Sequence, residues 1–274
     1  MPDKPSKFVD VDRLIREKNP TAYKFIPGWL IKYLSETVIH ESFLNDIMTS
    51  YPDTLNFDFC RVICERFGLK VRIEGEENIP KEGGVIFAAN HPLGGMDAIA
   101  VMSAIDSHRN DVKFLVNDLL MNIPQLKGIF VGVNKFGATA REGIRAVDQA
   151  FAGDSALFIF PAGMVSRMTR YKVIRDLDWK KTFITKAKKY NKPVVPVHIS
   201  GRLSKRFYFV ARLRKFFGIK MNIEMLLLAQ ETIKQEGNTI VVKYGQPIHP
   251  ETFDRSKKDQ DWAYDVKSKV YDLK

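Results

Sequence analysis

The stretch that decides the fold spans residues 84–97 and reads Gly-Val-Ile-Phe-Ala-Ala-Asn-His-Pro-Leu-Gly-Gly-Met-Asp. Its first half is short, apolar and partly β-branched, which predicts a buried strand. One proline and two glycines then force a turn. Asp97 opens an amphipathic segment over residues 98–107 that predicts a helix with Asp97 at or near its N-cap. The pattern therefore places the imidazole of His91 at the mouth of a sheet, with a carboxylate close behind it.

His91 and Asp97 form a candidate acid–base pair. A carboxylate that accepts a hydrogen bond from one ring nitrogen leaves the other nitrogen free to take a proton. The pair also has a purely structural interpretation, because an aspartate at the start of a helix commonly acts only as its cap. The choice between the two interpretations depends on the rest of the chain.

From residue 69 onward the sequence alternates between strand and helix patterns. Strands are predicted at 70–74, 84–89, 112–116, 156–160, 193–199 and 239–244, and helices at 98–107, 138–151, 178–190 and 255–273. This alternation predicts an α/β fold with a mostly parallel sheet flanked by helices. Ligands in such folds bind beyond the carboxyl ends of the strands. Because His91, Gly163 and Arg167 all follow predicted strands, we expect them to share one site.

The chain of 274 residues is long enough for one large domain with an extension. Residues 1–68 are predicted to form a helical N-terminal segment, and residues 69–274 the α/β domain. Within the segment, apolar residues recur at helical spacing over 27–48 and include an aromatic-edged stripe around Trp29 and Tyr33. This stripe suits either packing on the main domain or resting on a membrane.

Four short blocks follow one another along the chain. They are Asn90 to Asp97, Val131 to Lys135, Phe160 to Arg167, and Val194 to Ile199. In order and separation, from Leu69 to Pro250, they resemble the blocks of the glycerolipid acyltransferase family, which includes the 1-acylglycerol-3-phosphate acyltransferases. The resemblance implies transfer of a fatty acyl chain from an acyl thioester, carried by acyl carrier protein or coenzyme A, to a hydroxyl of a lyso-lipid.

The chemistry of such a transfer suggests roles for most of the site residues. His91 deprotonates the acceptor hydroxyl, and Asp97 orients the imidazole. The residues expected at the substrate site are Asn90, Lys135, Gly163, Ser166 and Arg167. Backbone N–H groups around Gly163 would stabilise the oxyanion, Lys135 and Arg167 would hold an anionic group of either substrate, and Ser166 would contribute a hydrogen bond. Surface salt bridges are the alternative for the two cations. No metal or other cofactor is implied.

Two departures from the family pattern bear on the pairing and on the acceptor. Five residues separate His91 from Asp97 where the family has four, and glycines in the turn can absorb the extra residue. In the third block, Ala162 and Val165 stand where the family carries a glutamate and an arginine associated with the acceptor's phosphate.

These variants, together with residues 226–231 and 241–248, resemble the hemolysin-like branch of the family more closely. That branch includes enzymes that O-acylate lyso-ornithine or lyso-glycine lipids. A lyso-aminoacyl lipid is therefore the expected acceptor, with 1-acylglycerol-3-phosphate as the alternative. An acyl ester or thioester hydrolase and a non-catalytic membrane-associated lipid-binding protein remain open as other classes.

The net charge of +11 is concentrated in residues 202–220. This segment holds seven basic residues and no acidic one, interleaved with large aromatic residues. The mixture suits an interfacial helix on an anionic membrane. The alternatives are a helix whose aromatic residues face the core, and a nucleic-acid surface. We expect an anionic membrane surface as the partner of 202–220 and no nucleic acid.

The remaining sequence features concern the compartment. Cys60 and Cys64 lie four residues apart in a helical pattern, which predicts buried thiols in a reducing cytosol. No run of about 18 apolar residues predicts a transmembrane helix, and the N-terminus lacks the apolar core of a secretory signal. The sequence thus predicts a peripheral protein on the cytoplasmic face of the inner membrane.

Overall fold

The computed structural model describes residues 7–18, 20–116, 120–132 and 140–274. The chain forms two compact units, Met1–Thr54 with Ser204–Gln235, and Leu55–Leu203 with Glu236–Lys274. The boundary expected after residue 68 does not coincide with this division. Helix α5 (Asn56–Arg66) belongs to the sheet unit, because it packs its buried face against helix α6 (Gly95–Ile105).

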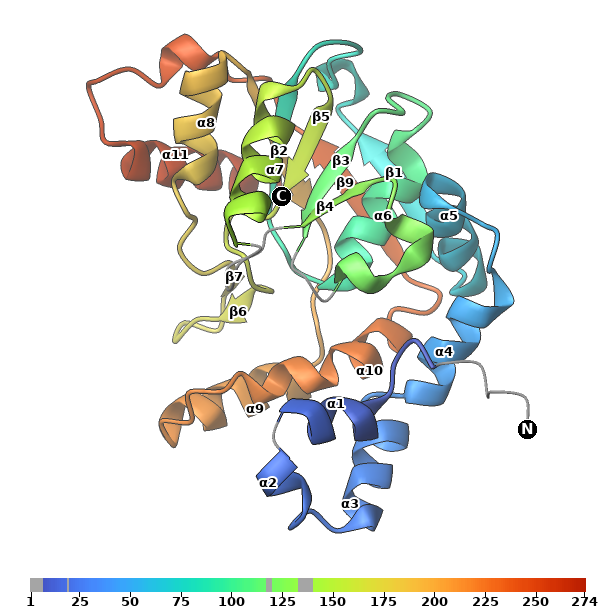
Figure 1. Ribbon diagram of the computed structural model, residues 1–274. Coiled ribbons are helices and arrows are strands. Elements are labelled where there is room, and N and C mark those ends of the chain that lie inside the picture. The colour runs from blue at the N-terminus through green and yellow to red at the C-terminus, as the bar shows by residue number, and fades with distance from the viewer. Residues whose placement is uncertain (1–6, 19, 117–119, 133–139) are drawn as a thin grey trace. The chain divides into compact units, whose positions relative to one another are not determined.

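The core of the larger unit is a seven-stranded sheet in the order β1-β9-β8-β2-β5-β3-β4 (Figure 1). The strands are β1 (Lys70–Glu74), β2 (Val85–Ala89), β3 (Lys113–Val116), β4 (Phe130–Gly132), β5 (Ala156–Ile159), β8 (Val194–Ile199) and β9 (Thr239–Tyr244). Neighbouring strands are parallel except β8 and β9, which are antiparallel. The predicted mostly parallel sheet flanked by helices is confirmed.

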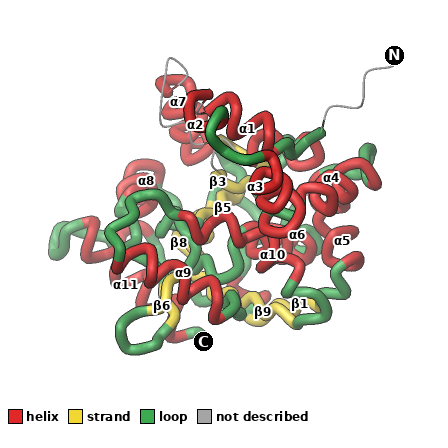
Figure 2. The backbone as a smooth tube through the Cα atoms, turned by 90° about the horizontal axis from the view of Figure 1, so that it is seen from below, coloured by secondary structure: helices red, strands yellow, loops and turns green. Residues whose placement is uncertain are grey.

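Helices cover both sides of this sheet (Figure 2). Helices α7 (Ala140–Ala152), α8 (Thr182–Tyr190) and α11 (Asp259–Asp272) share one apolar cluster with β2, β5 and β8. Helices α5 and α6 pack together on the other side. β2, β5 and β8 are buried at every position, as strands covered on both faces must be.

Short elements connect these parts of the larger unit. Strands β6 (Arg167–Met168) and β7 (Ile174–Arg175) form a two-stranded antiparallel sheet after the third block. Single turns of 3-10 helix lie at Glu76–Asn78, Leu120–Asn122, Pro124–Leu126 and Pro250–Thr252.

The smaller unit is helical, as expected for the N-terminal extension. Its elements are α1 (Val11–Lys18), α2 (Pro20–Tyr23), α3 (Gly28–Tyr33), a π-helical turn (Leu34–Val38), α4 (Glu41–Ser50), α9 (Lys205–Phe216), a 3-10 helix (Ile223–Leu227) and α10 (Leu228–Ile233). The buried carboxylate of Glu41 joins α4 to the residues at the start of this unit. It accepts hydrogen bonds from Lys7 Nζ at 2.6 Å and from the Val11 N–H at 3.0 Å. The basic segment 202–220 therefore belongs largely to this unit.

Three further predictions concern the cysteines, membrane-spanning helices and the bounds of two helices. Cys60 and Cys64 are free, buried thiols of α5, as predicted. None of the helices in the described ranges combines the length and hydrophobicity that crossing a bilayer requires. The helix expected at 178–190 begins only at Thr182, and the closing helix begins at Asp259.

Candidate active site

The imidazole of His91 and the carboxylate of Asp97 meet where β2 ends. His91 Nδ1 lies 2.9 Å from Asp97 Oδ2. The Asp97 side chain is completely buried, whereas that of His91 is 18% exposed. One ring nitrogen is thus committed to a buried carboxylate while the ring keeps access to solvent, which is the geometry expected of a general base and its orienting acid.

Asp97 is held by the turn that precedes it. Helix α6 begins at Gly95, so Asp97 lies in its first turn, near the N-cap as expected, but is not the capping residue itself. The N-cap is Gly94, whose φ of 73° is readily adopted only by glycine. Asp97 Oδ2 also accepts the N–H of Leu93 at 2.9 Å, so the carboxylate bonds back to the turn and to His91. The five-residue spacing is therefore compatible with the pairing.

Burial raises the pKa of Asp97 above its ordinary value, and the hydrogen bond and charge of His91 oppose this effect. A buried anion of this kind is stabilised by a positive neighbour much more strongly than an exposed one is.

The third block supplies the ring partner of His91. The ring of Phe160, directly after β5, stacks on the imidazole with centroids 4.2 Å apart and planes at 22°. The backbone N–H of Ser166 donates to the carbonyl oxygen of His91 at 2.8 Å. The first and third blocks are therefore brought together at the carboxyl ends of two adjacent parallel strands, as the sequence predicted.

Two residues of the third block differ from their expected roles. The N–H of Gly163 donates to the carbonyl of Phe160 at 2.9 Å, so this N–H is occupied in a turn and is not presented to an oxyanion. The hydroxyl of Ser166 is buried and donates to Asp176 Oδ1 at 2.5 Å, so its proton is committed to the loop.

Asn90 is likewise placed in a structural role. Its side-chain amide donates to the carbonyl of Ile199 at 2.9 Å, and its oxygen accepts the N–H of Ile199 at 2.7 Å. Asn90 is buried, and these bonds join the ends of β2 and β8. Asn90 therefore holds the strand that carries His91, through both its amide N–H and its oxygen.

The two expected cations have different outcomes. Lys135 lies outside the described residues. Arg167 begins β6, directly after Ser166, and its guanidinium donates to the carbonyl of Val165 at 2.6 Å. A further cation lies near the same loop, because the Lys180 ammonium is 3.4 Å from where a Cβ on Gly163 would stand.

Asp176 and Trp179 were not predicted from the sequence, yet both contribute to the site. Asp176 is buried and contacts the backbone of His91 through a hydrogen bond of 3.2 Å, and Trp179 donates to the same carboxylate at 2.9 Å. The only local sequence signal for this contact is an aspartate followed three residues later by a tryptophan, after the third block. Residues 178–190 were expected to be helical, which hid this signal.

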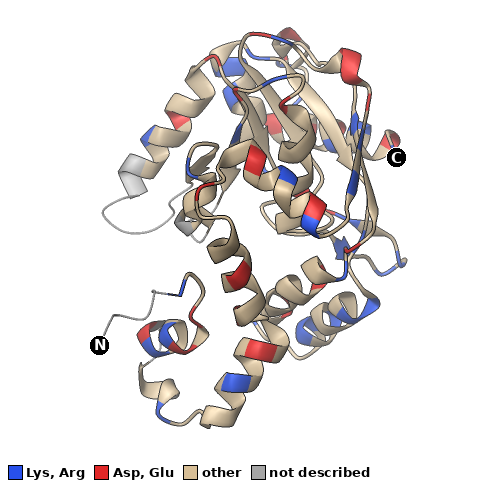
Figure 3. Ribbon diagram, turned by 90° about the vertical axis from the view of Figure 1, so that its right-hand side faces the viewer, with Lys and Arg blue, Asp and Glu red and all other residues tan. Residues whose placement is uncertain are grey.

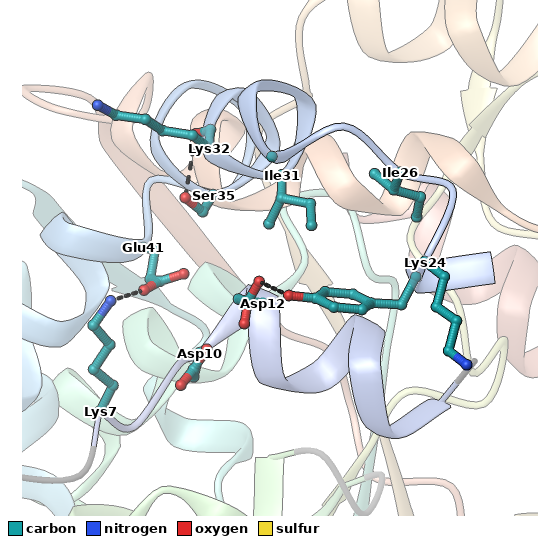
Figure 4. A pocket seen from close by; sticks show the side chains of 11 residues that line it. Lys7, Asp10, Asp12, Lys24, Ile26, Ile31, Lys32, Ser35 and Glu41 are labelled. Atoms are coloured by element: carbon teal, nitrogen blue, oxygen red, sulfur yellow. Dashed lines mark hydrogen bonds and ion pairs between the residues drawn. The ribbon is translucent and has the colours of Figure 1, made fainter. Parts of the chain in front are cut away.

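A separate pocket of about 530 Å³ lies in the helical unit and is lined by Lys7, Asp10, Asp12, Tyr23, Lys24, Ile26, Gly28, Ile31, Lys32, Ser35 and Glu41 (Figure 4). Two of its carboxylates have partners within the pocket: Glu41 pairs with Lys7, and Asp12 accepts the Tyr23 hydroxyl at 2.8 Å. None of the predicted site residues lines it. Within the described ranges, no group of three or more histidine, cysteine or acidic side chains could hold a metal ion.

The fold and the site define a class of protein: an α/β enzyme with a histidine, oriented by a buried carboxylate, at the end of a central parallel strand. The chain belongs to the acyltransferase family. The family model described as "Acyltransferase" matches residues 13–274, which cover the larger unit and most of the smaller one. The protein is therefore an acyltransferase.

Two curated relatives are similar over nearly the whole chain. The lyso-glycine lipid O-acyltransferase of Bacteroides thetaiotaomicron is 43% identical over 267 residues, which cover 97% of each chain. The lyso-glycine lipid O-acyltransferase of Phocaeicola vulgatus is 39% identical, over 97% of this chain and 95% of its own. A solved structure, the 1-acyl-sn-glycerophosphate (LPA) acyltransferase PlsC from Thermotoga maritima, is 20% identical with a TM-score of 0.49, over 96% of this chain and 97% of that one.

Proposed function

We propose that this acyltransferase moves a fatty acyl chain from an acyl thioester to the hydroxyl of a lyso-aminoacyl lipid, and that the acceptor is a lyso-glycine lipid. The observation that carries the proposal is the contact of 2.9 Å between His91 Nδ1 and the buried carboxylate of Asp97. The names of the two relatives support the acceptor. Acyl carrier protein or coenzyme A carries the donor chain.

The reaction begins with removal of a proton. Because Nδ1 of His91 faces Asp97, the other ring nitrogen, Nε2, takes the proton of the acceptor hydroxyl. The oxygen attacks the thioester carbon, and the charge of the resulting imidazolium is stabilised by Asp97. The tetrahedral intermediate then collapses, the C–S bond breaks, and the thiolate takes the proton from His91. An ester and a free thiol are the products.

The third block supports an acceptor without phosphate. Ala162 and Val165, which replace the family's glutamate and arginine, are buried apolar side chains and offer neither charge nor hydrogen bond to a phosphate. The glycine headgroup of a lyso-glycine lipid carries a single carboxylate. Arg167 and Lys180 supply cations beside this loop for such a group.

The acceptor is tested by offering the purified enzyme a labelled acyl carrier protein thioester with a panel of lyso-lipids. We expect lyso-glycine lipid to be acylated at least about tenfold faster than 1-acylglycerol-3-phosphate, because one or two missing ion pairs to phosphate are worth that much. Product mass separates the esterified lipid from free fatty acid. Preference for 1-acylglycerol-3-phosphate contradicts the acceptor assignment, and release of free fatty acid alone contradicts acyl transfer.

We also propose that the enzyme rests peripherally on the cytoplasmic face of the membrane through residues 202–220. Lys and Arg occur over the whole chain (Figure 3), but α9 combines them with outward aromatic rings. Phe207 and Tyr208 of α9 are buried, so part of the helix packs on its own unit. Phe209 and Phe216 are 63% and 83% exposed, so the other part is available to lipid.

Exposed apolar side chains elsewhere in the helical unit support the same proposal. Trp29 and Phe25 are 71% and 82% exposed. Aromatic rings flanked by basic residues partition into the headgroup region of anionic membranes, where each basic residue contributes on the order of 1 kcal/mol. The side on which acyl carrier protein and anionic lipids occur together is the cytoplasmic one.

Replacing three exposed phenylalanines of this region (Phe209→Ser, Phe216→Ser and Phe217→Ser together) is expected to weaken binding to anionic vesicles at least about tenfold, because their apolar area no longer leaves water. Vesicle co-sedimentation measures the change. Tyr264→Ser, which removes a ring that is 40% exposed from α11, is the control and is expected to bind as the wild type does. Equal binding by all three proteins would contradict the surface assignment.

A further inference from the structure

Asp176 is a buried carboxylate that the transfer chemistry above does not use. It follows β7 and is 6% exposed. Three donors converge on its two oxygens. Oδ1 accepts the backbone N–H of His91 at 3.2 Å and the Ser166 hydroxyl at 2.5 Å, and Oδ2 accepts the indole N–H of Trp179 at 2.9 Å.

These bonds fix the main chain of His91 from both sides. Its N–H is held by Asp176, and its carbonyl oxygen accepts the N–H of Ser166 at 2.8 Å. Because the hydroxyl of Ser166 binds the same carboxylate, His91, Ser166 and Asp176 form a closed ring of hydrogen bonds. The first and third blocks are joined through this ring.

The main chain of Asp176 is anchored in turn by the closing helix. Its N–H donates to the Tyr271 hydroxyl at 2.7 Å, and Lys267 Nζ donates to its carbonyl oxygen at 2.9 Å. Both partners lie on α11, which packs against β8 and β2. The main chain of His91 is therefore held by α11, through Asp176, as well as by its own strand.

Both oxygens of the Asp176 side chain accept hydrogen bonds from these three donors. A carboxylate has acceptor sites on both oxygens and no proton of its own. An amide in the same place would turn an N–H toward one of the donors, and buried donors without an acceptor destabilise the local structure. The chemistry of the surrounding groups thus requires an aspartate and not its neutral analogue.

We propose that Asp176 is a positioning residue for acyl transfer: it fixes the backbone of His91 against the third block, while Asp97 fixes the ring. This inference rests on the proposed function, because positioning matters only if His91 is the base. The two carboxylates divide the task, since Asp97 bonds to the side chain of His91 and Asp176 to its main chain.

The test compares Asp176→Asn with a matched control, Asp111→Asn. Asp111 is also a carboxylate that holds a loop, because it accepts a hydrogen bond from Arg109 Nε at 2.6 Å. It precedes β3, so it lies at the amino ends of the parallel strands, opposite to His91. We expect Asp176→Asn to lower kcat about tenfold to hundredfold with KM for both substrates within about twofold, because a small displacement of the base costs that much. Asp111→Asn is expected to keep kcat while lowering the melting temperature.

A milder variant covers the case in which Asp176→Asn does not fold. Ser166→Ala removes one of the three donors and opens the ring, and a loss of kcat of about threefold to tenfold is expected. When both changes are combined, the loss should be smaller than the product of the single losses, because both act on the same ring. The proposal is overturned if kcat is unchanged in Ser166→Ala and also unchanged in Asp176→Asn, where that variant folds.

Hydrogen exchange supplies a readout that needs no activity. Asp176→Asn, or Ser166→Ala in its place, should speed exchange in peptides containing His91 and Ser166, whereas Asp111→Asn should not. Unchanged exchange there overturns the ring, and faster exchange with an unchanged kcat overturns the positioning role. If the wild type acylates no lyso-lipid, the proposed function fails, and the exchange result alone then decides whether Asp176 holds His91.

Discussion

Replacing His91 by alanine is expected to lower kcat for acyl transfer by about 10³-fold or more, because no other group replaces a positioned general base. The fold should survive, since the side chain is 18% exposed and its ring contacts are those with Asp97 and Phe160. The measurement is the rate of labelled acyl transfer to lyso-glycine lipid, with circular dichroism as a check on folding.

A second histidine of the same unit serves as the control for this change. His108 pairs with Glu76 at 3.1 Å, at the far end of α6 from Asp97. His108→Ala is expected to keep the wild-type rate within about twofold, as surface changes usually do. If His91→Ala and His108→Ala transferred acyl chains equally well, His91 would not be the base.

The second large effect is expected at Asp97, where the size of the loss depends on the replacement. Asp97 Oδ2 accepts both His91 Nδ1 and the Leu93 N–H, while Oδ1 has no hydrogen-bond partner among the described residues. An asparagine can therefore keep both bonds with its oxygen and place its amide nitrogen where Oδ1 now lies. The negative charge is lost, and the buried amide N–H groups find no acceptor where Oδ1 lay. We expect kcat to fall by about 10²-fold.

Alanine at position 97 removes the bonds as well as the charge. The Leu93 N–H and the His91 ring both lose their acceptor, so the loss in kcat should exceed that of Asp97→Asn by about tenfold. Loss of a buried hydrogen-bonded acceptor should also lower the free energy of unfolding by about 1–3 kcal/mol. Steady-state kinetics and chemical denaturation measure the two effects. Equal rates for the alanine and asparagine variants would show that Asp97 does not orient the ring.

Local patterns were sufficient to predict the sheet and the contact between His91 and Asp97. The runs at 84–89, 156–160 and 193–199 are short, apolar and β-branched, and all three form central strands. His91 and Asp97 are six residues apart, so a turn and the first turn of a helix determine their contact. Information within one segment of the chain therefore suffices for these features.

The supporting contacts depend on residues distant in sequence and could not be predicted in this way. Asn90 bonds to Ile199, which is 109 residues away, and His91 bonds to Asp176, which is 85 residues away. A polar residue that follows a strand suggests a ligand site. Only the tertiary structure shows that the side chains of Asn90 and Ser166 form hydrogen bonds with other parts of the protein, Ile199 and Asp176. The same limit applies to Ser204–Gln235, which forms one compact unit with the N-terminal helices although most of the sequence separates them.

The most direct test of His91 as the general base is the rate of acyl transfer by His91→Gly as a function of added imidazole. The glycine leaves a space bounded by the ring of Phe160 and the carboxylate of Asp97, which free imidazole fits. We predict almost no transfer without imidazole and a saturable recovery as its concentration rises. A rate near that of the wild type in the absence of imidazole would contradict the assignment of His91 as the base.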